Sequence, residues 1–447
     1  MINIAEFFNN NKKYFKDLVT LAIPILTGHI AHTLINIGDI LVAGRHSTLA
    51  LAAISVASAI FMTFSIVGIG LIISVSPVVA NLRGKREDSK SLIRPTLLYS
   101  FVIGIIIFLL TRLSAYFVPH IELADNLGPY VIEYLNITSW SAFGICIFVG
   151  LKEFLQAYEV VKFPNLLAVI SIFANLIFNI IFVFGFLFVP AFGIKGLAYA
   201  TTTVRIGQAL ILLLYCTPYL KLHLRRQKGF MKDLLKVGWP IALASFIEFL
   251  GFNITAVLAG KFSAVLSAAH NIIITFAGAT YSVPLSIASA LAVKIGFARG
   301  ERNYLDIVKY YRAGIIFIIL FMSTMSVFYL VTSEHIIKLF TPDTEVVQAT
   351  IPVMALFAFF LVFDGLQGIS GGALRGIKKT KPIMFSMLFA FLFIGIPVGC
   401  TLAFKYGIVL KGFWIGLALA LCSASIFSTS FFLYNLKKIK KELTKQL

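Results

Sequence analysis

The sequence predicts an all-α polytopic membrane protein, with twelve transmembrane helices in two pseudo-symmetric six-helix lobes. Apolar residues make up 59% of the 447 positions and charged residues only 13%, against roughly 25% charged residues in an ordinary soluble domain. Long apolar runs recur along the chain with no large polar block between them. The runs are continuous rather than alternating, which excludes a membrane β-barrel.

Each of twelve apolar runs is long enough to cross a bilayer as a helix, which needs about 20 residues. We expect these helices near residues 17–42, 50–80, 95–117, 129–156, 165–189, 193–218, 233–258, 266–293, 308–332, 347–373, 382–404 and 411–436.

The formal net charge of +19 is concentrated in short loops. If the helices alternate in direction, 30 of the 38 Lys and Arg residues fall on one side, together with both termini, and seven fall on the other. Arg205 lies inside a predicted span. Because cytoplasmic loops carry the excess of Lys and Arg, we expect both termini in the cytoplasm. This pattern indicates membrane topology, not nucleic-acid binding.

The chain contains an internal repeat with an offset of 216 residues. The clearest matches pair Lys16-Asp17-Leu18 with Lys232-Asp233-Leu234, Ala43-Gly44 with Ala259-Gly260, and Arg83-Gly84 with Arg299-Gly300. We therefore divide the chain into an N-lobe (1–218), a basic cytoplasmic inter-lobe loop (219–232) and a C-lobe with a basic tail (233–447). An even number of helices per lobe predicts a symmetry axis along the membrane normal.

A duplicated membrane bundle without soluble domains is typical of a carrier that works by alternating access. No Walker A sequence, HExxH motif or Ser–His nucleophile arrangement is present, so we expect neither an enzyme nor a cofactor. The four cysteines fall inside apolar runs, with spacings that fit neither a disulfide framework nor a metal site.

Three carboxylates lie inside predicted spans: Asp39, Glu248 and Asp364. An acidic residue at the bilayer centre costs about 2.5–3.5 kcal/mol on insertion scales. The functional interpretation is that these groups face a cavity and bind a cation or a proton. The alternative is that each is a neutral acid in an interhelical hydrogen bond.

Polar residues accompany these acids. Asn175 and Asn179 are four residues apart and share one helix face, where they could hydrogen-bond Asp39, bind a cation or hold helices together. Thr201 lies in the next predicted helix. We interpret His270 as a packing residue. The glycine-rich stretch 365–376 would allow close helix approach.

Several motifs resemble the multidrug and toxic compound extrusion (MATE) transporters, in their NorM-like branch. They are GDILVAG and ALAAISVAS near residues 38–58, GWPIALASFIE at 238–248, SAAHNI at 267–272, VPLSIASALAVKIGFARG at 283–300 and FDGLQGISGGALRG at 363–376. With the twelve-helix layout, the resemblance covers essentially the whole chain.

The resemblance implies an antiporter that exports cationic, amphipathic drugs and toxins in exchange for Na⁺ or H⁺. Asp39 would be the N-lobe acid, supported by Asn175, Asn179 and Thr201. Glu248 and Asp364 would be the C-lobe acids and could hold Na⁺ transiently. It further implies a monomer in the bacterial cytoplasmic (inner) membrane, with lipid and small molecules as its partners.

Two departures from relatives leave the coupling ion open. Asn179 stands where some members carry Asp, and Phe360 stands where some carry Tyr. The alternative function is a flippase for a lipid-linked precursor. That function would favour basic residues facing an anionic headgroup, and Arg205 is the one basic residue that the sequence places within a span.

Overall fold

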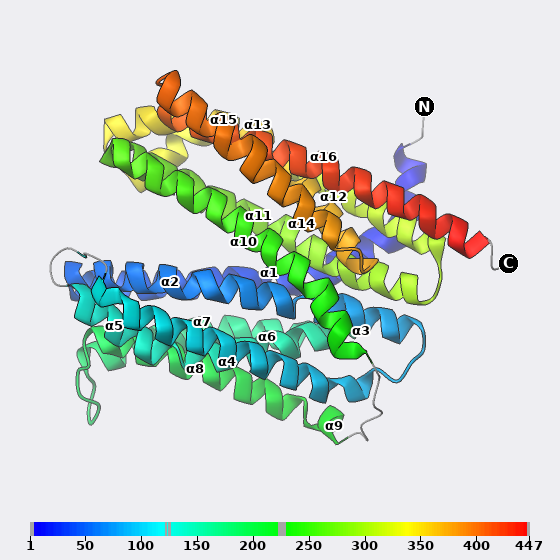
Figure 1. Ribbon diagram of the computed structural model, residues 1–447, viewed down its shortest axis with the longest axis horizontal. Helices are drawn as coiled ribbons and strands as arrows, with labels where there is room; N and C mark the ends of the chain where they lie inside the picture. The colour runs from blue at the N-terminus through cyan, green and yellow to red at the C-terminus, as the bar shows by residue number, and fades with distance from the viewer. Residues whose placement is uncertain (1–3, 121–122, 124–126, 222–228, 445–447) are drawn as a thin grey trace. The chain divides into compact units, whose positions relative to one another are not determined.

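The protein is almost entirely helical in the computed structural model, which describes residues 4–444 except 121–122, 124–126 and 222–228 (Figure 1). The predicted inter-lobe loop lies largely outside the described residues. The helices are Ile4–His46 (α1), Thr48–Ile72 (α2), Val75–Gly84 (α3), Ile93–Phe117 (α4), Leu127–Thr138 (α5), Ser141–Ala157 (α6), Lys162–Phe184 (α7), Ile194–Tyr215 (α8), Thr217–Leu220 (α9), Phe230–Phe262 (α10), Ala264–Gly300 (α11), Tyr304–Phe340 (α12), Thr344–Gly376 (α13), Lys381–Leu388 (α14), Ile396–Cys400 (α15) and Val409–Thr444 (α16).

The predicted all-α membrane fold is confirmed. Within the described residues, eleven helical segments are long and apolar enough to cross a membrane. A twelfth span is the pair α5 and α6, which is bent by 42°. The predicted span at 129–156 is therefore a broken helix, and every predicted span has a counterpart.

Two predicted spans are interrupted rather than regular. The span at 50–80 consists of α2 and α3, separated by a turn at residues 73–74. The span at 382–404 alternates α14 and α15 with π-helical segments at Phe389–Gly395 and Thr401–Lys405. Pro397 lies in the first turn of α15, and because proline lacks a backbone donor it disturbs the hydrogen-bond ladder of the preceding turn.

The capping of helix starts repeats at the 216-residue offset found in the sequence. Ser47 caps α2 by accepting a hydrogen bond from the Ala50 N–H, and Ser263 caps α11 in the same way through the Leu266 N–H. Both serines have extended backbone, with φ of −168° and −164°. A serine hydroxyl at this position satisfies a helix-end N–H that lacks a partner.

The backbone geometry at helix ends repeats at the same offset. Arg86 and Arg302 both adopt the left-handed conformation, with φ of 59° and 61°. The backbone N–H that follows each donates to the carbonyl five residues back, from Glu87 to Leu82 and from Asn303 to Ala298. This is the Schellman arrangement that closes a helix. The two halves thus share local backbone geometry as well as sequence.

The chain forms two compact units whose boundaries differ from those of the sequence repeat. One unit, here the N-unit, is Pro24–Ala242, and the other, the C-unit, combines Met1–Ile23 with Leu243–Leu447. Residues before Pro24 in α1 therefore belong to the C-unit, and residues before Leu243 in α10 belong to the N-unit. Each unit therefore contains the beginning of a long helix, α1 or α10, whose remainder belongs to the other unit.

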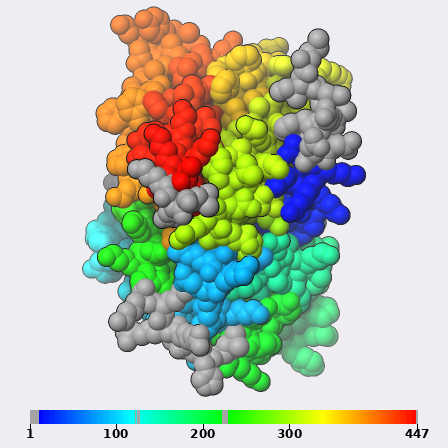
Figure 2. Space-filling model, turned by 90° about the vertical axis from the view of Figure 1, so that its right-hand side faces the viewer, coloured from blue at the N-terminus to red at the C-terminus, as the bar shows by residue number. Residues whose placement is uncertain are grey.

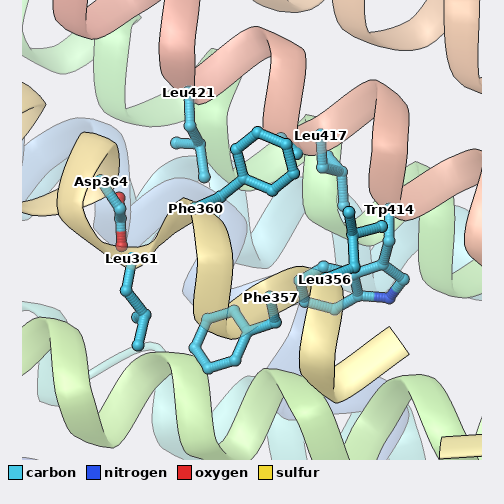
Figure 3. Close-up of a pocket in the computed structure, with 9 residues that line it drawn as sticks. Leu356, Phe357, Phe360, Leu361, Asp364, Trp414, Leu417 and Leu421 are labelled. Atoms are coloured by element: carbon cyan, nitrogen blue, oxygen red, sulfur yellow. The ribbon is translucent and has the colours of Figure 1, made fainter. Parts of the chain in front are cut away.

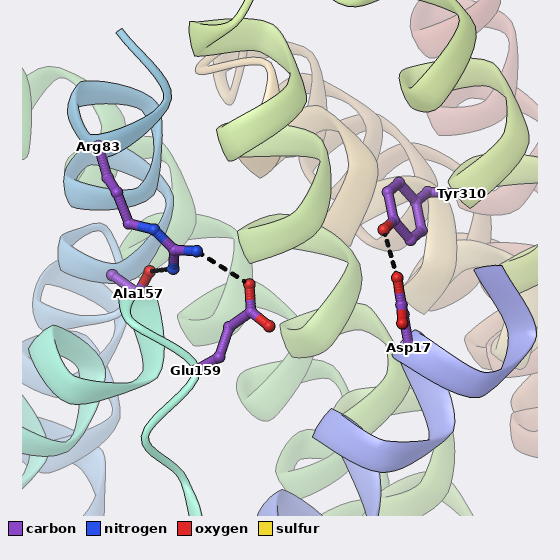
Figure 4. A network of polar contacts seen from close by, with 5 residues as sticks. All are labelled: Asp17, Arg83, Ala157, Glu159 and Tyr310. Atoms are coloured by element: carbon purple, nitrogen blue, oxygen red, sulfur yellow. Dashed lines mark hydrogen bonds and ion pairs between the residues drawn. The ribbon is translucent and has the colours of Figure 1, made fainter. Parts of the chain in front are cut away.

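Each unit has its own helical core. In the N-unit, α6 packs against α4 and α8, while α7 packs against α8, and Figure 1 shows these helices running lengthwise beside one another. In the C-unit, α13 is central and contacts α11, α12 and α16. Arg83, at the end of α3, donates to the carbonyl of Ala157 at 2.8 Å and pairs with Glu159 at 3.3 Å (Figure 4).

Candidate functional site

The N-unit contains a carboxylate held by polar side chains from two other helices. Asp39 on α1 is only 6% exposed. Its Oδ1 accepts a hydrogen bond from Asn179 Nδ2 on α7 at 2.7 Å, and its Oδ2 accepts one from Thr201 Oγ1 on α8 at 3.0 Å. The structure therefore brings together three of the residues that the sequence selected.

Asn175 completes this cluster. Asn179 Nδ2 also donates to Asn175 Oδ1 at 3.1 Å, because a spacing of four residues places both side chains on the same face of α7. Both asparagines are almost fully buried, and Asn179 Oδ1 has no hydrogen-bond partner among the described residues. The cluster thus offers carboxylate, amide and hydroxyl oxygens, which are the ligands that hard cations prefer.

A buried arginine lies close to this cluster. Arg205 on α8 donates to Ser141 Oγ at 2.9 Å, and its guanidinium lies 5.1 Å from the ring centre of Phe61. Arg205 and Asp39 interact electrostatically without forming an ion pair within 4 Å. The carboxylate therefore keeps its two donors while a cation partly balances its charge.

A second cation inside the N-unit is Lys152, which falls within the predicted span 129–156 but was counted with the Lys and Arg residues of the cytoplasmic side. It lies within α6, and the position of a Cβ on Gly28 of α1 would be 3.1 Å from its Nζ. Lys152 and Arg205 both act electrostatically on His32 of α1, and Glu153 acts on Lys152. Lys152 lies near the end of an apolar run, so position in sequence alone did not distinguish a loop from a span.

The C-unit contains the other two predicted acids. Glu248 on α10 is half-buried and Asp364 on α13 is buried, and the two carboxylates interact electrostatically. Neither has a hydrogen-bond or ion-pair partner among the described residues. Tyr281 on α11 interacts electrostatically with both acids, and its hydroxyl donates a hydrogen bond to Gln367 Oε1 at 3.2 Å.

These two acids form a pair of like charges, and no Lys or Arg side chain in the described part of the chain is bonded to either. Such a pair favours uptake of a proton or a cation, because like charges in a poorly solvated site repel each other. Neither Tyr281 nor Gln367 was predicted from the sequence to belong to the site. Their packing beside the acids depends on how α11 meets α13, which the sequence pattern does not specify.

A small pocket lies next to Asp364 between α13 and α16 (Figure 3). Its walls are mostly aliphatic with three aromatic side chains, and the acid is the one lining residue with a formal charge. The residues that line it are Leu356, Phe357, Phe360, Leu361, Asp364, Trp414, Leu417, Ala418 and Leu421.

His270 packs as the sequence suggests. It is 1% exposed, and its ring lies 5.7 Å from that of Trp414. It hydrogen-bonds the backbone of Phe252, while its Nδ1 has no partner in the described part of the chain. Within that part, no group of three or more His, Cys, Asp or Glu side chains could hold a metal ion.

The fold and these acids define a multi-pass membrane protein built from two similar halves, with carboxylates inside each unit. The MatE family model matches residues 24–184 and 240–401, which together make up more than half of the chain. The two matches begin 216 residues apart, the offset of the internal repeat. The chain belongs to the MATE family of multidrug transporters.

Individual relatives agree with this assignment. A curated protein from Idiomarina loihiensis, named probable multidrug resistance protein NorM, is 28% identical over 435 residues, and the match covers 94% of each chain. A crystal structure of a MATE protein in complex with MaL6 shares the fold with a TM-score of 0.87 at 21% identity, covering 96% of this chain and 97% of that one.

A further structural neighbour is a MOP superfamily transporter from Pyrococcus furiosus, described as having a binding pocket of reverse polarity. It has a TM-score of 0.86 at 20% identity and covers 96% of this chain and 97% of its own. At these identities, the structural neighbours establish the fold alone.

Proposed function

We propose that this protein is a secondary active antiporter that exports cationic, amphipathic compounds in exchange for Na⁺ or H⁺. The observation that carries the proposal is the pair Glu248 and Asp364, two acids that interact with each other and have no bonded cation among the described residues. An inward-moving ion and an outward-moving organic cation could both use such a pair. The name of the Idiomarina relative supports the drug-export part of the proposal.

In this mechanism, ion binding and drug binding favour opposite states of an alternating-access cycle. A ligand can shift that equilibrium only through its different affinity for the two states. The membrane potential contributes about 2.3 kcal/mol per charge per 100 mV. The Asp39 cluster would be a second ion site, with Asn175, Asn179 and Thr201 as its supporting oxygens.

The proposal includes a cellular setting. We place the protein as a monomer in the bacterial cytoplasmic membrane, with both termini in the cytoplasm, as the distribution of Lys and Arg suggests. It would need no cofactor besides the coupling ion and would catalyse no covalent chemistry.

The experiment is dye transport by everted vesicles that contain the protein, under a Na⁺ gradient alone and then under a pH gradient alone; in everted vesicles export is measured as dye uptake. We expect one of the two gradients to drive export of a fluorescent cationic dye. Vesicles with the double variant Glu248→Gln/Asp364→Asn serve as the control. Equal dye movement in both preparations would contradict the proposal.

A second candidate function is favoured by the interior of the N-unit. The sequence analysis counted Arg205 alone as a basic residue inside a span, whereas in the structure both Lys152 of α6 and Arg205 of α8 act electrostatically on His32. Two cations around one point attract an anionic group, as a flippase for a lipid-linked precursor would require. Asp39 and Glu153 offset part of this charge, so we rank this function second. Transport of a lipid-linked phosphate and not of cationic dye would favour it.

A further inference from the structure

The last part of α16 carries basic residues beyond the length of helix that a bilayer requires. The helix Val409–Thr444 has 36 residues, about 54 Å at 1.5 Å per residue, whereas the hydrocarbon core of a bilayer is about 30 Å thick. At least one end of α16 therefore lies outside the hydrocarbon, and the lysines mark this end. The exposed lysines of its final turns are Lys437, Lys438, Lys440 and Lys441.

One face of this basic segment is docked on the C-unit. Glu442 forms an ion pair with Arg299, at the end of α11, with an N–O distance of 2.7 Å. Further back along α16, the ring of Phe432 lies 4.1 Å from that of Tyr311 on α12. The apolar residues buried on this face are Phe432, Leu436 and Ile439. Because this face is held, the opposite face has a defined position on the molecule.

The opposite face carries one continuous stripe that changes from aromatic to basic. Its residues follow one another at intervals of four and three positions, which places them on one side of a helix. They are all exposed: Phe427, Phe431, Tyr434, Lys438 and Lys441. Exposed phenylalanines suit the hydrocarbon, tyrosine suits the membrane interface, and lysine suits the headgroup region. The stripe therefore crosses one membrane boundary in the order expected for a lipid-facing surface.

The lysines of the stripe have no acidic partner in the described part of the chain. The ammonium group of Lys438 lies 4.6 Å from the ring centre of Tyr434, an arrangement that attracts a cation to the ring face. Glu442 is one helical turn after Lys438, but it pairs with Arg299 instead. The positive charge of Lys438 and Lys441 is thus available to an anion from outside the protein.

A neighbouring helix extends the aromatic part of this surface. α14 packs against α16, and the ring of Phe389, just after α14, meets the ring of Phe427 edge to face at 5.4 Å. Phe385 and Phe389 are both exposed. Lys381, also exposed, begins α14. It precedes Phe389 by eight residues, about 12 Å along a helix, so a third cation lies at the basic end of the surface.

We propose that this surface, here the lipid face, binds an anionic phospholipid. The phosphate pairs with Lys438 and Lys441, the glycerol lies beside Tyr434, and the acyl chains lie along Phe431 and Phe427. Opposite charge brings the headgroup to the lysines, and apolar area holds the chains. The proposal needs only that α16 spans a membrane, and it is independent of the coupling ion and of the exported compounds.

The competing interpretation is a diffuse basic tail, whose charge only orients the chain in the membrane. A diffuse tail attracts anionic lipid through all four lysines equally, whatever side of the helix they occupy. The lipid face makes them unequal, because Lys438 and Lys441 continue the aromatic stripe while Lys437 and Lys440 lie on its flank. Two double variants with the same loss of charge therefore separate the two interpretations.

The test places a reporter within the stripe. The protein with Tyr434→Trp and with Trp140→Phe/Trp239→Phe has an indole on the lipid face. The remaining tryptophan, Trp414, is 3% exposed and lies twenty residues earlier, about 30 Å along α16. The protein is reconstituted in phosphatidylcholine vesicles with a small, equal fraction of either brominated phosphatidylglycerol or brominated phosphatidylcholine. Bromine quenches an indole only at close range, so quenching measures which lipid occupies the face.

We expect phosphatidylglycerol to occupy the face with a preference of about tenfold or more over phosphatidylcholine, since each lysine near an anionic headgroup contributes about fivefold. Lys438→Gln/Lys441→Gln in the reporter protein should remove most of this preference. The matched control is Lys437→Gln/Lys440→Gln, which removes the same charge and should keep most of the preference. All four lysines are exposed, so the unfolding midpoints of the two variants should agree.

Equal quenching by the two brominated lipids would overturn the proposal, and an equal loss of preference in the two double variants would establish the diffuse tail instead. Inorganic phosphate, compared with NaCl at the same ionic strength, should leave the preference unchanged because the aromatic surface also holds the chains. If phosphate abolishes the preference, the lysines bind free phosphate and the lipid assignment is wrong. Should Lys438→Gln/Lys441→Gln fail to fold, the comparison of the two lipids in the reporter protein still decides.

Discussion

The hydroxyl of Tyr310 donates a hydrogen bond to Asp17 Oδ2 at 2.7 Å (Figure 4). A reciprocal bond runs from Tyr14 to Asp306 Oδ1 at 2.8 Å, and the two tyrosine rings meet edge to face at 4.8 Å. We call these four residues the clasp. Figure 2 shows the first part of α1, in blue, at the surface beside the yellow-green start of α12. The clasp holds the beginning of α1 within the C-unit.

The clasp should contribute measurably to stability. Both tyrosines are 7% exposed, and a hydrogen bond to a charged group contributes about 1.5–3 kcal/mol. We expect Tyr310→Phe to lower the thermal unfolding midpoint of the purified protein, and the double variant Tyr14→Phe/Tyr310→Phe to lower it further. Tyr406→Phe is the control, because Tyr406 is 62% exposed. A midpoint unchanged in the double variant would show that the clasp is energetically neutral.

A second prediction concerns Thr201, which supplies one of the two side-chain donors to Asp39. Thr201→Val keeps the shape of the side chain and removes that donor. If the cluster binds the coupling ion, its geometry should change and ion-driven efflux should fall by about tenfold or more, since a hydrogen bond to a charge is worth about 1.5–3 kcal/mol.

The matched control for this variant is Thr203→Val, two residues along α8. Thr203 is exposed and makes no side-chain hydrogen bond that involves Asp39. Efflux by Thr203→Val should match the wild type, as should the amount of folded protein in both variants. If the Thr201 variant exports dye at the normal rate, the Asp39 cluster has no part in coupling.

The sequence was sufficient to predict the number and position of the spans, because hydrophobic length is a local property of the chain. It also predicted that Asn175 and Asn179 share a helix face, since helical periodicity fixes that relationship. The hydrogen bonds of Asn179 and Thr201 to Asp39 join residues more than 130 positions apart. Resemblance to a family suggested this proximity, whereas spacing along the chain did not.

Other features depend on packing that no local pattern encodes. The contact of His270 with the Trp414 ring depends on how α16 meets α11, and the position of the Lys152 ammonium depends on the absence of a side chain at Gly28. The exchange of the first helix segments between the two units was also missed. The repeat locates equivalent residues, but it does not say which unit each segment packs against.

The third prediction concerns the acids of the C-unit. Glu248→Gln and Asp364→Asn preserve side-chain size and remove the charge that would bind the coupling ion. We expect either variant to abolish ion-driven dye efflux from vesicles while membrane insertion stays intact. The control is Glu334→Gln, because Glu334 is exposed and pairs only with Lys338 among the described residues, four residues later on α12. Normal export by both single variants would reject a coupling role for these acids.

The last prediction uses two adjacent glycines of the stretch 365–376. A Cβ on Gly372 would lie 2.5 Å from the backbone oxygen of Ala288 and 2.8 Å from its Cα, whereas a Cβ on Gly371 would meet nothing within 4 Å. Gly372→Ala therefore has to push α13 away from α11, and overpacking of this kind costs about 1–3 kcal/mol. Gly371→Ala should be neutral or stabilising, because alanine favours a helix over glycine by about 0.8–1.0 kcal/mol.

Thermal unfolding of the two variants, compared in the same detergent, measures this difference. The α11–α13 contact also positions Tyr281, since the Cβ site of Gly368 lies 3.3 Å from its hydroxyl. Gly372→Ala should therefore reduce efflux as well as stability, while Gly371→Ala should leave both intact. Equal midpoints would mean that α11 and α13 can separate at no cost, and the close approach of these helices would then not be what holds Tyr281 beside the acids.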